Sequence, residues 1–151
     1  MQAVQYVVEG WGVGELYLGD GRLLWHELPA ARRPGEIDMH PLAERFRAYF
    51  AGERDDFGDV ELDLEWATLF QRAVADALRA VPYGEVVTYG ELAALAGRPN
   101  AQRAAGTFCA GNRFPLVLPC HRVVAAGGLG SYGSLGTRYK RRLLQLEGVA
   151  L

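Results

Sequence analysis

The hydrophobic pattern of this 151-residue chain changes near Trp66, and that change limits the folds open to it. Before Trp66, short apolar or alternating segments are separated by glycine-rich turns, which predicts a small antiparallel meander. These segments are residues 3–8, 15–18 and 22–26. After Trp66, apolar residues recur at helical spacing. The sequence therefore predicts an α/β protein of two lobes: a small N-terminal antiparallel sheet-and-helix domain, residues 1–66, and a mainly helical C-terminal domain, residues 67–151.

The first lobe is expected to contain one helix and a last strand. Residues 41–51 place apolar side chains such as Leu42 and Phe46 on one stripe, and Asp38 is a candidate cap for that helix. Residues 60–64 alternate between apolar and acidic side chains, as a half-buried strand does.

The second lobe is expected to contain a helix-turn-helix. A helix over residues 68–80 comes first. Thr88 then caps a second helix, with Glu91 at the capping-box position. The turn Gly97-Arg98-Pro99-Asn100 follows, and Asn100 is the expected cap of a third helix over residues 101–110. Two short helices across a four-residue turn are typical of DNA-binding proteins.

The third of these helices carries mostly small residues, with Arg103 as its one cation. A bare helix face lets the backbone approach another surface closely. Packing against a neighbouring helix explains small residues equally well, so this pattern alone leaves both interpretations open.

Charge is distributed unevenly along the chain. Residues 1–91 carry eight Lys/Arg against seventeen Asp/Glu, whereas residues 92–151 carry eight Lys/Arg against Glu147 alone. A basic half inside an acidic chain is typical of a surface that meets phosphates, although a solvated positive face without a partner is the alternative. Together with the small-residue helix, the basic half favours DNA.

Several functional classes are disfavoured by composition. No apolar stretch is long enough to cross a bilayer and no signal-peptide pattern is visible, so we expect a cytoplasmic protein without membrane contact. The two cysteines, Cys109 and Cys120, suit a reducing compartment. Neither has a metal-binding spacing, and we expect no metal and no cofactor.

The reactive chemistry is expected in the segment Pro119-Cys120-His121-Arg122-Val123. Imidazole and guanidinium groups near a thiol raise its thiolate fraction, and the thiolate is the nucleophile. Neighbours along a strand point to opposite faces, so His121 reaches Cys120 only through a bend at Pro119 or a bridging water. On spacing alone, a buried structural cysteine beside a chance histidine is the simpler interpretation.

These residues resemble the active-site signature of the O6-alkylguanine-DNA alkyltransferases. The resemblance extends over roughly residues 67–150 and includes several further motifs in the family's order. They are Val81-Pro82-Tyr83-Gly84-Glu85-Val86-Val87-Thr88-Tyr89, Arg103-Ala104-Ala105-Gly106, Gly111-Asn112, Tyr132 and Leu146-Glu147-Gly148. The N-terminal part resembles the family only loosely.

The resemblance implies a role for each candidate residue. Cys120 is the nucleophile and alkyl acceptor, His121 takes its proton through water, and Glu147 orients the imidazole, as in a triad. Asn112 supports the active-site turn, and Tyr89 contacts a phosphate and donates a proton toward departing guanine.

The implied binding residues fall into two sets. Arg103 enters the duplex as the target nucleotide is flipped out, and Arg98 and Tyr89 are further candidate DNA contacts. Val123 and Tyr132 line the base pocket, with Ser134 a candidate beside them. The implied partner is double-stranded DNA containing O6-alkylguanine, bound by a monomer without an obligate protein partner.

The chain departs from the family pattern at Gly133, where some members carry a serine after the pocket tyrosine, and at Cys109-Ala110, where many carry an arginine. Three alternatives to an alkyltransferase stay open. A damage-recognition protein that flips the base without transfer is disfavoured by the presence of Cys120. A helix-turn-helix regulator needs an additional domain, and a cysteine hydrolase is more remote.

Overall fold

The computed structural model describes all 151 residues, which form two compact units. The first unit consists of residues 1–63 and 113–115, and the second of residues 64–112 and 116–151. The main division lies three residues before the boundary expected from sequence, and the return of residues 113–115 to the first unit was not expected. None of the helices combines the length and the apolar character that crossing a bilayer requires.

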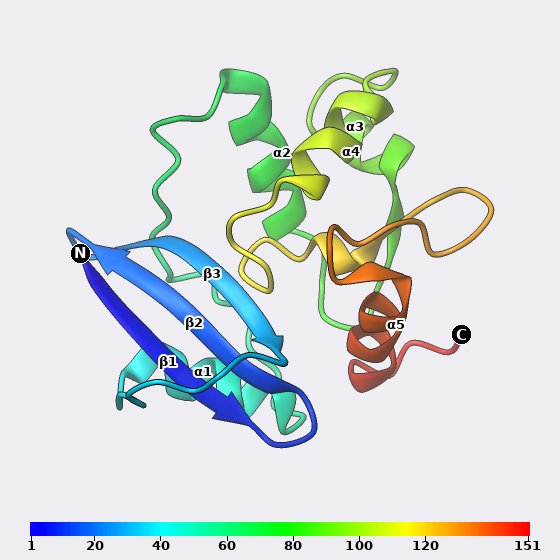
Figure 1. Ribbon diagram of the computed structural model, residues 1–151. Coiled ribbons are helices and arrows are strands. Elements are labelled where there is room, and N and C mark those ends of the chain that lie inside the picture. The colour runs from blue at the N-terminus through cyan, green and yellow to red at the C-terminus, as the bar shows by residue number, and fades with distance from the viewer. The chain divides into compact units, whose positions relative to one another are not determined.

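A three-stranded antiparallel sheet forms the centre of the first unit, with its strands in chain order (Figure 1). The strands are β1 (Gln2–Val8), β2 (Gly12–Gly19) and β3 (Arg22–Ala30), and the helix α1 (Pro41–Phe50) packs against β1. Alternate residues such as Val4, Tyr6 and Leu16 are buried, and the ring of Tyr6 stacks on that of Phe46 in α1. The meander predicted from sequence is therefore present, with longer strands.

Two expectations for the first unit are wrong. His40, not Asp38, caps α1, because its Nδ1 accepts a hydrogen bond from the backbone N–H of Leu42 at 3.1 Å. Residues 60–64 form no strand; they make only an isolated bridge between Leu23 and Leu62.

His26, on β3, lies at the centre of the first unit and is 2% exposed. Its Nδ1 donates to the carbonyl of Pro115 at 3.0 Å, because a carbonyl can only accept. Its Nε2 therefore accepts from the Tyr6 hydroxyl at 2.7 Å. The imidazole also stacks on the ring of Phe46 at 4.0 Å between centroids. Both ring nitrogens are thus used by the neutral form, and burial lowers the pKa of His26 from its ordinary 6.5 to about 4.

This histidine predicts an acid-sensitive first unit. Because the folded-state pKa of His26 is below its unfolded value, the unfolded chain binds more protons between pH 6.5 and about 4, and stability falls as pH falls through that window. We expect a loss of about 2–3 kcal/mol at the acidic end. Denaturant unfolding at several pH values measures it. His26→Phe keeps the stack on Phe46 but cannot be protonated. The difference in free energy of unfolding between the wild type and His26→Phe should therefore shrink as the pH is lowered. A difference that stays constant with pH contradicts the role assigned to His26.

The second unit is mainly helical (Figure 1). Its helices are α2 (Leu69–Arg79), α3 (Tyr89–Leu95), α4 (Gln102–Ala110) and α5 (Gly136–Leu146), with the 3-10 turn η1 (Cys120–Arg122). Two short strands, β4 (Val87–Thr88) and β5 (Val123–Val124), pair in parallel. This pairing joins the start of α3 to the end of η1, which positions the candidate site.

Two of the four helix starts in the second unit follow the local sequence. Thr68 and Thr88 cap α2 and α3 through capping boxes with Gln71 and Glu91. For α4 the expectation is wrong: Ala101, not Asn100, occupies the cap position, and no side chain caps the helix.

Candidate active site

Cys120 is the first residue of η1 and is 3% exposed. Its backbone N–H donates to the carbonyl of Leu118 at 2.8 Å, and that of Arg122 donates to Pro119 at 2.9 Å. The chain therefore bends directly after Pro119 instead of continuing as a strand. The bend considered from sequence is present, so Cys120 and His121 are not held on opposite faces of a sheet; the bridging water stays a prediction.

His121 and Glu147 form a fully buried pair, with Nε2 and Oε2 2.6 Å apart. The carboxylate can only accept, so Nε2 donates and Nδ1 carries the lone pair of the neutral ring. Arg122 donates to both carboxylate oxygens of Glu147, at 2.9 and 3.0 Å, and to the carbonyl of Val81 at 2.8 Å. The carboxylate is thus held by two side chains at once.

Gly84 supplies a further hydrogen bond to this carboxylate. Its backbone N–H donates to Glu147 Oε1 at 3.0 Å. Gly84 has φ of +80°, and a Cβ there would lie 3.2 Å from the Glu147 carbonyl oxygen. Only glycine adopts this conformation at low cost, which explains why the Pro82-Tyr83-Gly84 motif ends in glycine.

The electrostatics of the pair favour a neutral imidazole beside an ionised carboxylate. Burial lowers the pKa of His121, and the hydrogen bond to Glu147 opposes that shift only partly. Burial raises the pKa of Glu147, but the contacts with His121 and Arg122 outweigh it and hold the pKa well below its usual range. His121 is therefore available as a base, and Glu147 stabilises the imidazolium that would form.

The Cys120 thiol has three polar neighbours. Burial raises its pKa, and a hydrogen bond with the Cys109 thiol adds to the rise. The nearby Lys140 ammonium and a hydrogen bond with Asn112 act in the opposite direction. Asn112 also donates from Nδ2 to the Leu118 carbonyl at 2.8 Å. The resting thiol is therefore protonated, and a base has to remove its proton before attack.

Lys140 and Cys109 were not expected near the site. Lys140 is fully buried, and its Nζ donates to the carbonyls of Val123 at 2.5 Å and Ser131 at 3.2 Å. Its position does carry a signal: Lys140, Leu143, Leu144 and Glu147 share the i, i+3, i+4, i+7 spacing of a buried helix face.

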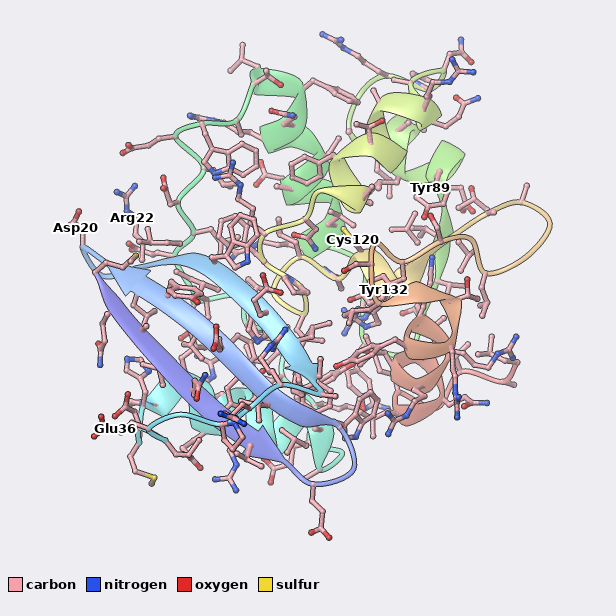
Figure 2. All side chains as sticks on the ribbon, in the orientation of Figure 1. Asp20, Arg22, Glu36, Tyr89, Cys120 and Tyr132 are labelled. Carbon is pink, nitrogen blue, oxygen red and sulfur yellow. The ribbon has the colours of Figure 1, made fainter.

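Tyr89 and Tyr132 lie on two other segments near Cys120 (Figure 2). Burial raises the pKa of Tyr89 to about 12 and that of Tyr132 well above its ordinary value, so both hydroxyls stay protonated as donors. The buried Tyr132 hydroxyl has no hydrogen-bond partner within the protein. A buried donor without a partner is costly, which suits a group that meets a ligand.

The remaining pocket candidates differ in burial. Val123 is fully buried in β5, and its carbonyl already accepts from Lys140. Ser134 is exposed and forms an isolated bridge with Tyr132.

The helix α4 presents a mostly small, exposed face. Ala105 and Phe108 are buried, whereas Gln102, Arg103, Ala104, Thr107 and Ala110 are exposed. On its Tyr89 side, α4 passes close to the aromatic ring, since a Cβ at Gly106 would make an ordinary van der Waals contact with it at 3.7 Å. Arg98, in the turn before α4, is exposed with its guanidinium 5.0 Å from the centroid of Phe70.

The second unit also carries the excess of positive charge. It contains nine Lys/Arg against five Asp/Glu, whereas the first unit contains seven against thirteen. The exposed face of α4 adds Arg103 and no acidic residue. Such a face is suited to a polyanion.

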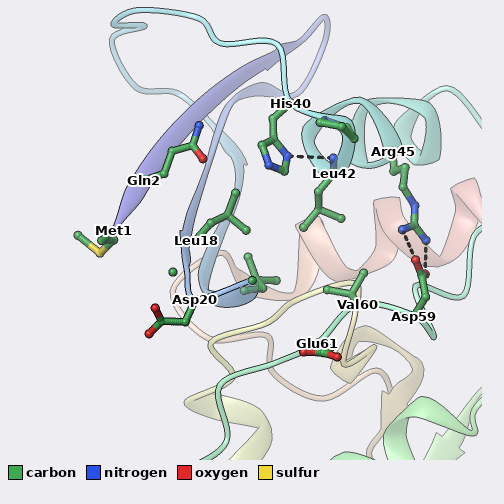
Figure 3. Close-up of a pocket in the computed structure, with 14 residues that line it drawn as sticks. Met1, Gln2, Leu18, Asp20, His40, Leu42, Arg45, Asp59, Val60 and Glu61 are labelled. Carbon is green, nitrogen blue, oxygen red and sulfur yellow. Dashed lines mark hydrogen bonds and ion pairs between the residues drawn. The ribbon is translucent and has the colours of Figure 1, made fainter.

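A pocket of about 840 Å³ in the first unit contains none of the candidate residues (Figure 3). Among its lining residues, His40 caps α1, and Arg45 forms an ion pair with Asp59 at 2.8 Å.

Comparison with known proteins bears on this arrangement. Residues 69–149 match the family model described as 6-O-methylguanine DNA methyltransferase, DNA binding domain. The chain belongs to this family. Its match confirms the resemblance drawn from the Pro119–Val123 signature, and it contains every catalytic candidate of the sequence analysis.

Relatives within the family are similar over different lengths. The methylated-DNA–protein-cysteine methyltransferase of Mycobacterium tuberculosis H37Rv is 49% identical over 105 residues, which are 69% of this chain and 62% of that protein. The chain thus spans less than two thirds of that relative's length. The protein of the same name from Methanosarcina acetivorans is 43% identical over 123 residues, 81% of this chain and 77% of that protein.

The fold is shared over almost the whole chain. The crystal structure of Mycobacterium tuberculosis OGT in complex with DNA has a TM-score of 0.81 at 36% identity and covers 97% of this chain and 92% of that one. This likeness confirms the predicted α/β class with a sheet-and-helix part and a helical part.

Proposed function

We propose that this protein repairs DNA by transferring an alkyl group from the O6 atom of guanine to the Sγ of its own Cys120. The observation that carries the proposal is the buried Cys120–His121 turn with Glu147 hydrogen-bonded to His121 at 2.6 Å, beside the small exposed face of α4. Similarity to proteins named methylated-DNA–protein-cysteine methyltransferase supports the substrate class.

The proposed reaction is a displacement at the alkyl carbon. His121, neutral and held by Glu147, takes the thiol proton of Cys120 through a water molecule. The thiolate attacks the carbon, the bond from carbon to O6 breaks, and guanine leaves with its electron pair. The protonated hydroxyl of Tyr89 donates toward the departing guanine, and Asn112 keeps the active-site turn in place. The products are a thioether and restored guanine.

Recognition requires the target base to leave the duplex. A bond to O6 is unreachable inside the base stack, and flipping costs a few kcal/mol. We propose that Tyr132 and Val123 line the pocket for the flipped base, with the Tyr132 hydroxyl as its hydrogen-bond donor and Ser134 at its edge. Arg103 fills the vacated space, and Arg98 contacts the backbone.

The proposal also covers the assembly. We propose a monomer that acts on double-stranded DNA without a protein partner or a cofactor. We place the reaction in the cytoplasm.

Stoichiometry tests the proposal. Incubation with a duplex that carries O6-methylguanine should add one methyl group to the intact mass of the protein, at Cys120, and then stop even with DNA in large excess. A thioether is a poor leaving group, and no disulfide is present for thiol exchange to regenerate the thiol. Sustained turnover contradicts the proposal, as does an unchanged mass.

The same experiment has a stability readout. A methyl group added to the buried Cys120 sulfur overpacks a site that fits a bare thiol, which typically costs about 1–3 kcal/mol. The methylated protein should therefore unfold at lower denaturant concentration than the fresh protein.

Arg103→Ala should slow repair of duplex DNA more than reaction with free O6-alkylguanine base, because only the duplex requires extrusion. Arg141→Ala removes the same charge from the exposed surface of α5 and is the matched control. Transfer rates on both substrates measure the effect, and equal losses on the two mean that Arg103 supports the fold. Duplex binding should weaken with salt, with a log–log slope of about −0.9 for each phosphate neutralised.

A further inference from the structure

The two cysteines of the chain lie in direct contact, although they belong to different elements. Cys109 is in the last turn of α4 and Cys120 begins η1. The Cys109 thiol lies close enough to Cys120 to raise the pKa of the Cys120 thiol. Eleven positions separate them in sequence, and the proposed transfer uses only Cys120.

Asn112 holds the two backbone segments together. Its N–H donates to the Cys109 carbonyl at 3.2 Å, and its Nδ2 donates to the Leu118 carbonyl at 2.8 Å. The same Leu118 carbonyl accepts from the Cys120 N–H at 2.8 Å. A short hydrogen-bonded bridge therefore holds the backbone at Cys109 close to the backbone at Cys120.

The two thiols differ in access. Both are free, with Cys120 buried and Cys109 partly exposed. A small oxidant from solvent therefore meets Cys109 first, while the buried partner sits within reach as a resolving thiol. Redox-sensitive cysteines typically combine exposure with such a neighbour.

We propose that Cys109 and Cys120 form a reversible intramolecular disulfide when the protein meets hydrogen peroxide. The Cys109 thiolate attacks one peroxide oxygen, the O–O bond breaks, and hydroxide leaves and takes up a proton as water. Cys109 is then a sulfenic acid. The Cys120 thiolate, next to the Lys140 ammonium, attacks that sulfur, the S–O bond breaks, and a second water leaves. Two thiols are oxidised and one peroxide is reduced.

The disulfide would control the alkyl acceptor. Its formation removes the Cys120 nucleophile, and a small thiol such as dithiothreitol restores it by exchange. It also protects Cys120 from irreversible oxidation to the sulfinic state. This regulatory consequence rests on the proposed alkyl transfer, whereas the disulfide itself does not.

Peroxide treatment of the reduced protein, followed by denaturation and thiol labelling, tests the disulfide. The wild type should lose both labelled thiols and the mass of two hydrogen atoms, remain a single chain on a non-reducing gel, and give a linked peptide containing Cys109 and Cys120. Cys109→Ser should keep Cys120 as a labelled thiol or convert it to oxygen-containing products. Two labelled thiols in the treated wild type, or a disulfide only between chains, overturns the proposal.

Alkyl transfer measured on the same samples tests whether the disulfide regulates Cys120. Each variant is compared with its own reduced form, so that an effect of Cys109→Ser on the basal rate does not enter. After peroxide treatment, alkyl transfer by the wild type should fall about tenfold or more, and dithiothreitol should restore it. Any alkyl transfer that Cys109→Ser loses to peroxide should not return with dithiothreitol. Undiminished alkyl transfer by a protein with a proven disulfide refutes the proposed regulation. A disulfide in a protein whose reduced form transfers nothing refutes the proposed function and leaves the disulfide standing.

Discussion

Cys120→Ser should abolish alkyl transfer while DNA affinity stays within a few-fold of the wild type. The thiol is a reactant in the proposed mechanism, and the exposed face of α4 that is proposed to meet DNA is unchanged by the substitution. A serine hydroxyl is nearly the size of a thiol but is a much weaker acid, so His121 cannot generate a useful nucleophile from it. Intact mass after incubation with O6-methylguanine duplex, together with fluorescence anisotropy on the same duplex, measures both properties.

The control is Cys109→Ser, which removes the other thiol and should retain transfer under reducing conditions. A methyl group gained by the Cys120→Ser protein at any position would show that the nucleophile is misassigned. A Cys120→Ser protein that binds damaged duplex without transfer would instead behave as the alternative considered from sequence, a recognition protein that flips the base and does not react.

Glu147→Gln should reduce both stability and transfer. The amide cannot neutralise Arg122 and cannot stabilise the His121 imidazolium, although its shape is nearly the same. Removing one partner of a buried ion pair typically costs about 3–5 kcal/mol, because the other charge stays buried without compensation. General acid–base assistance is worth on the order of 10²–10⁴ in rate, so transfer should fall by about a hundredfold or more.

The pH dependence separates positioning from a loss of structure. Without the carboxylate, the imidazole is a weaker base. The Cys120 thiolate then forms only as the pH rises toward the raised pKa of the thiol. Transfer by Glu147→Gln, measured well below its unfolding temperature, should therefore rise more steeply with pH than transfer by the wild type. Glu85→Gln changes an exposed carboxylate in the neighbouring turn and should alter neither property. Parallel pH profiles for Glu147→Gln and the wild type would contradict the positioning role.

Elements defined by local signals were predicted well from the sequence. The caps at Thr68 and Thr88 satisfy backbone N–H groups only three residues away, so their capping boxes are readable without knowledge of the fold. The start of α4 was not predicted, because Ala105 and Phe108 pack into the core and hold the helix without a side-chain cap. Tertiary packing overrides a local preference there.

In the candidate site too, features set by local sequence were predictable and features set by the path of the chain were not. The Cys120–His121 signature was recognisable as a motif, but the contact of Cys120 with Cys109 depends on the path of the chain between α4 and η1. No periodicity links those residues. Lys140 was different, since its helical spacing with Leu143 and Leu144 is itself a sequence signal for a buried helix face.

The return of residues 113–115 to the first unit limits how this protein can be recombined with its relatives. The Arg113 carbonyl accepts from the His26 N–H at 2.8 Å, the Pro115 carbonyl accepts from the His26 ring, and Phe114 is fully buried. A gene fragment that begins at Leu64 would carry this tripeptide without the sheet that pairs with it. A working chimera therefore has to take Arg113-Phe114-Pro115 from the same parent as residues 1–63, so the N-terminal unit is inherited as two pieces of sequence.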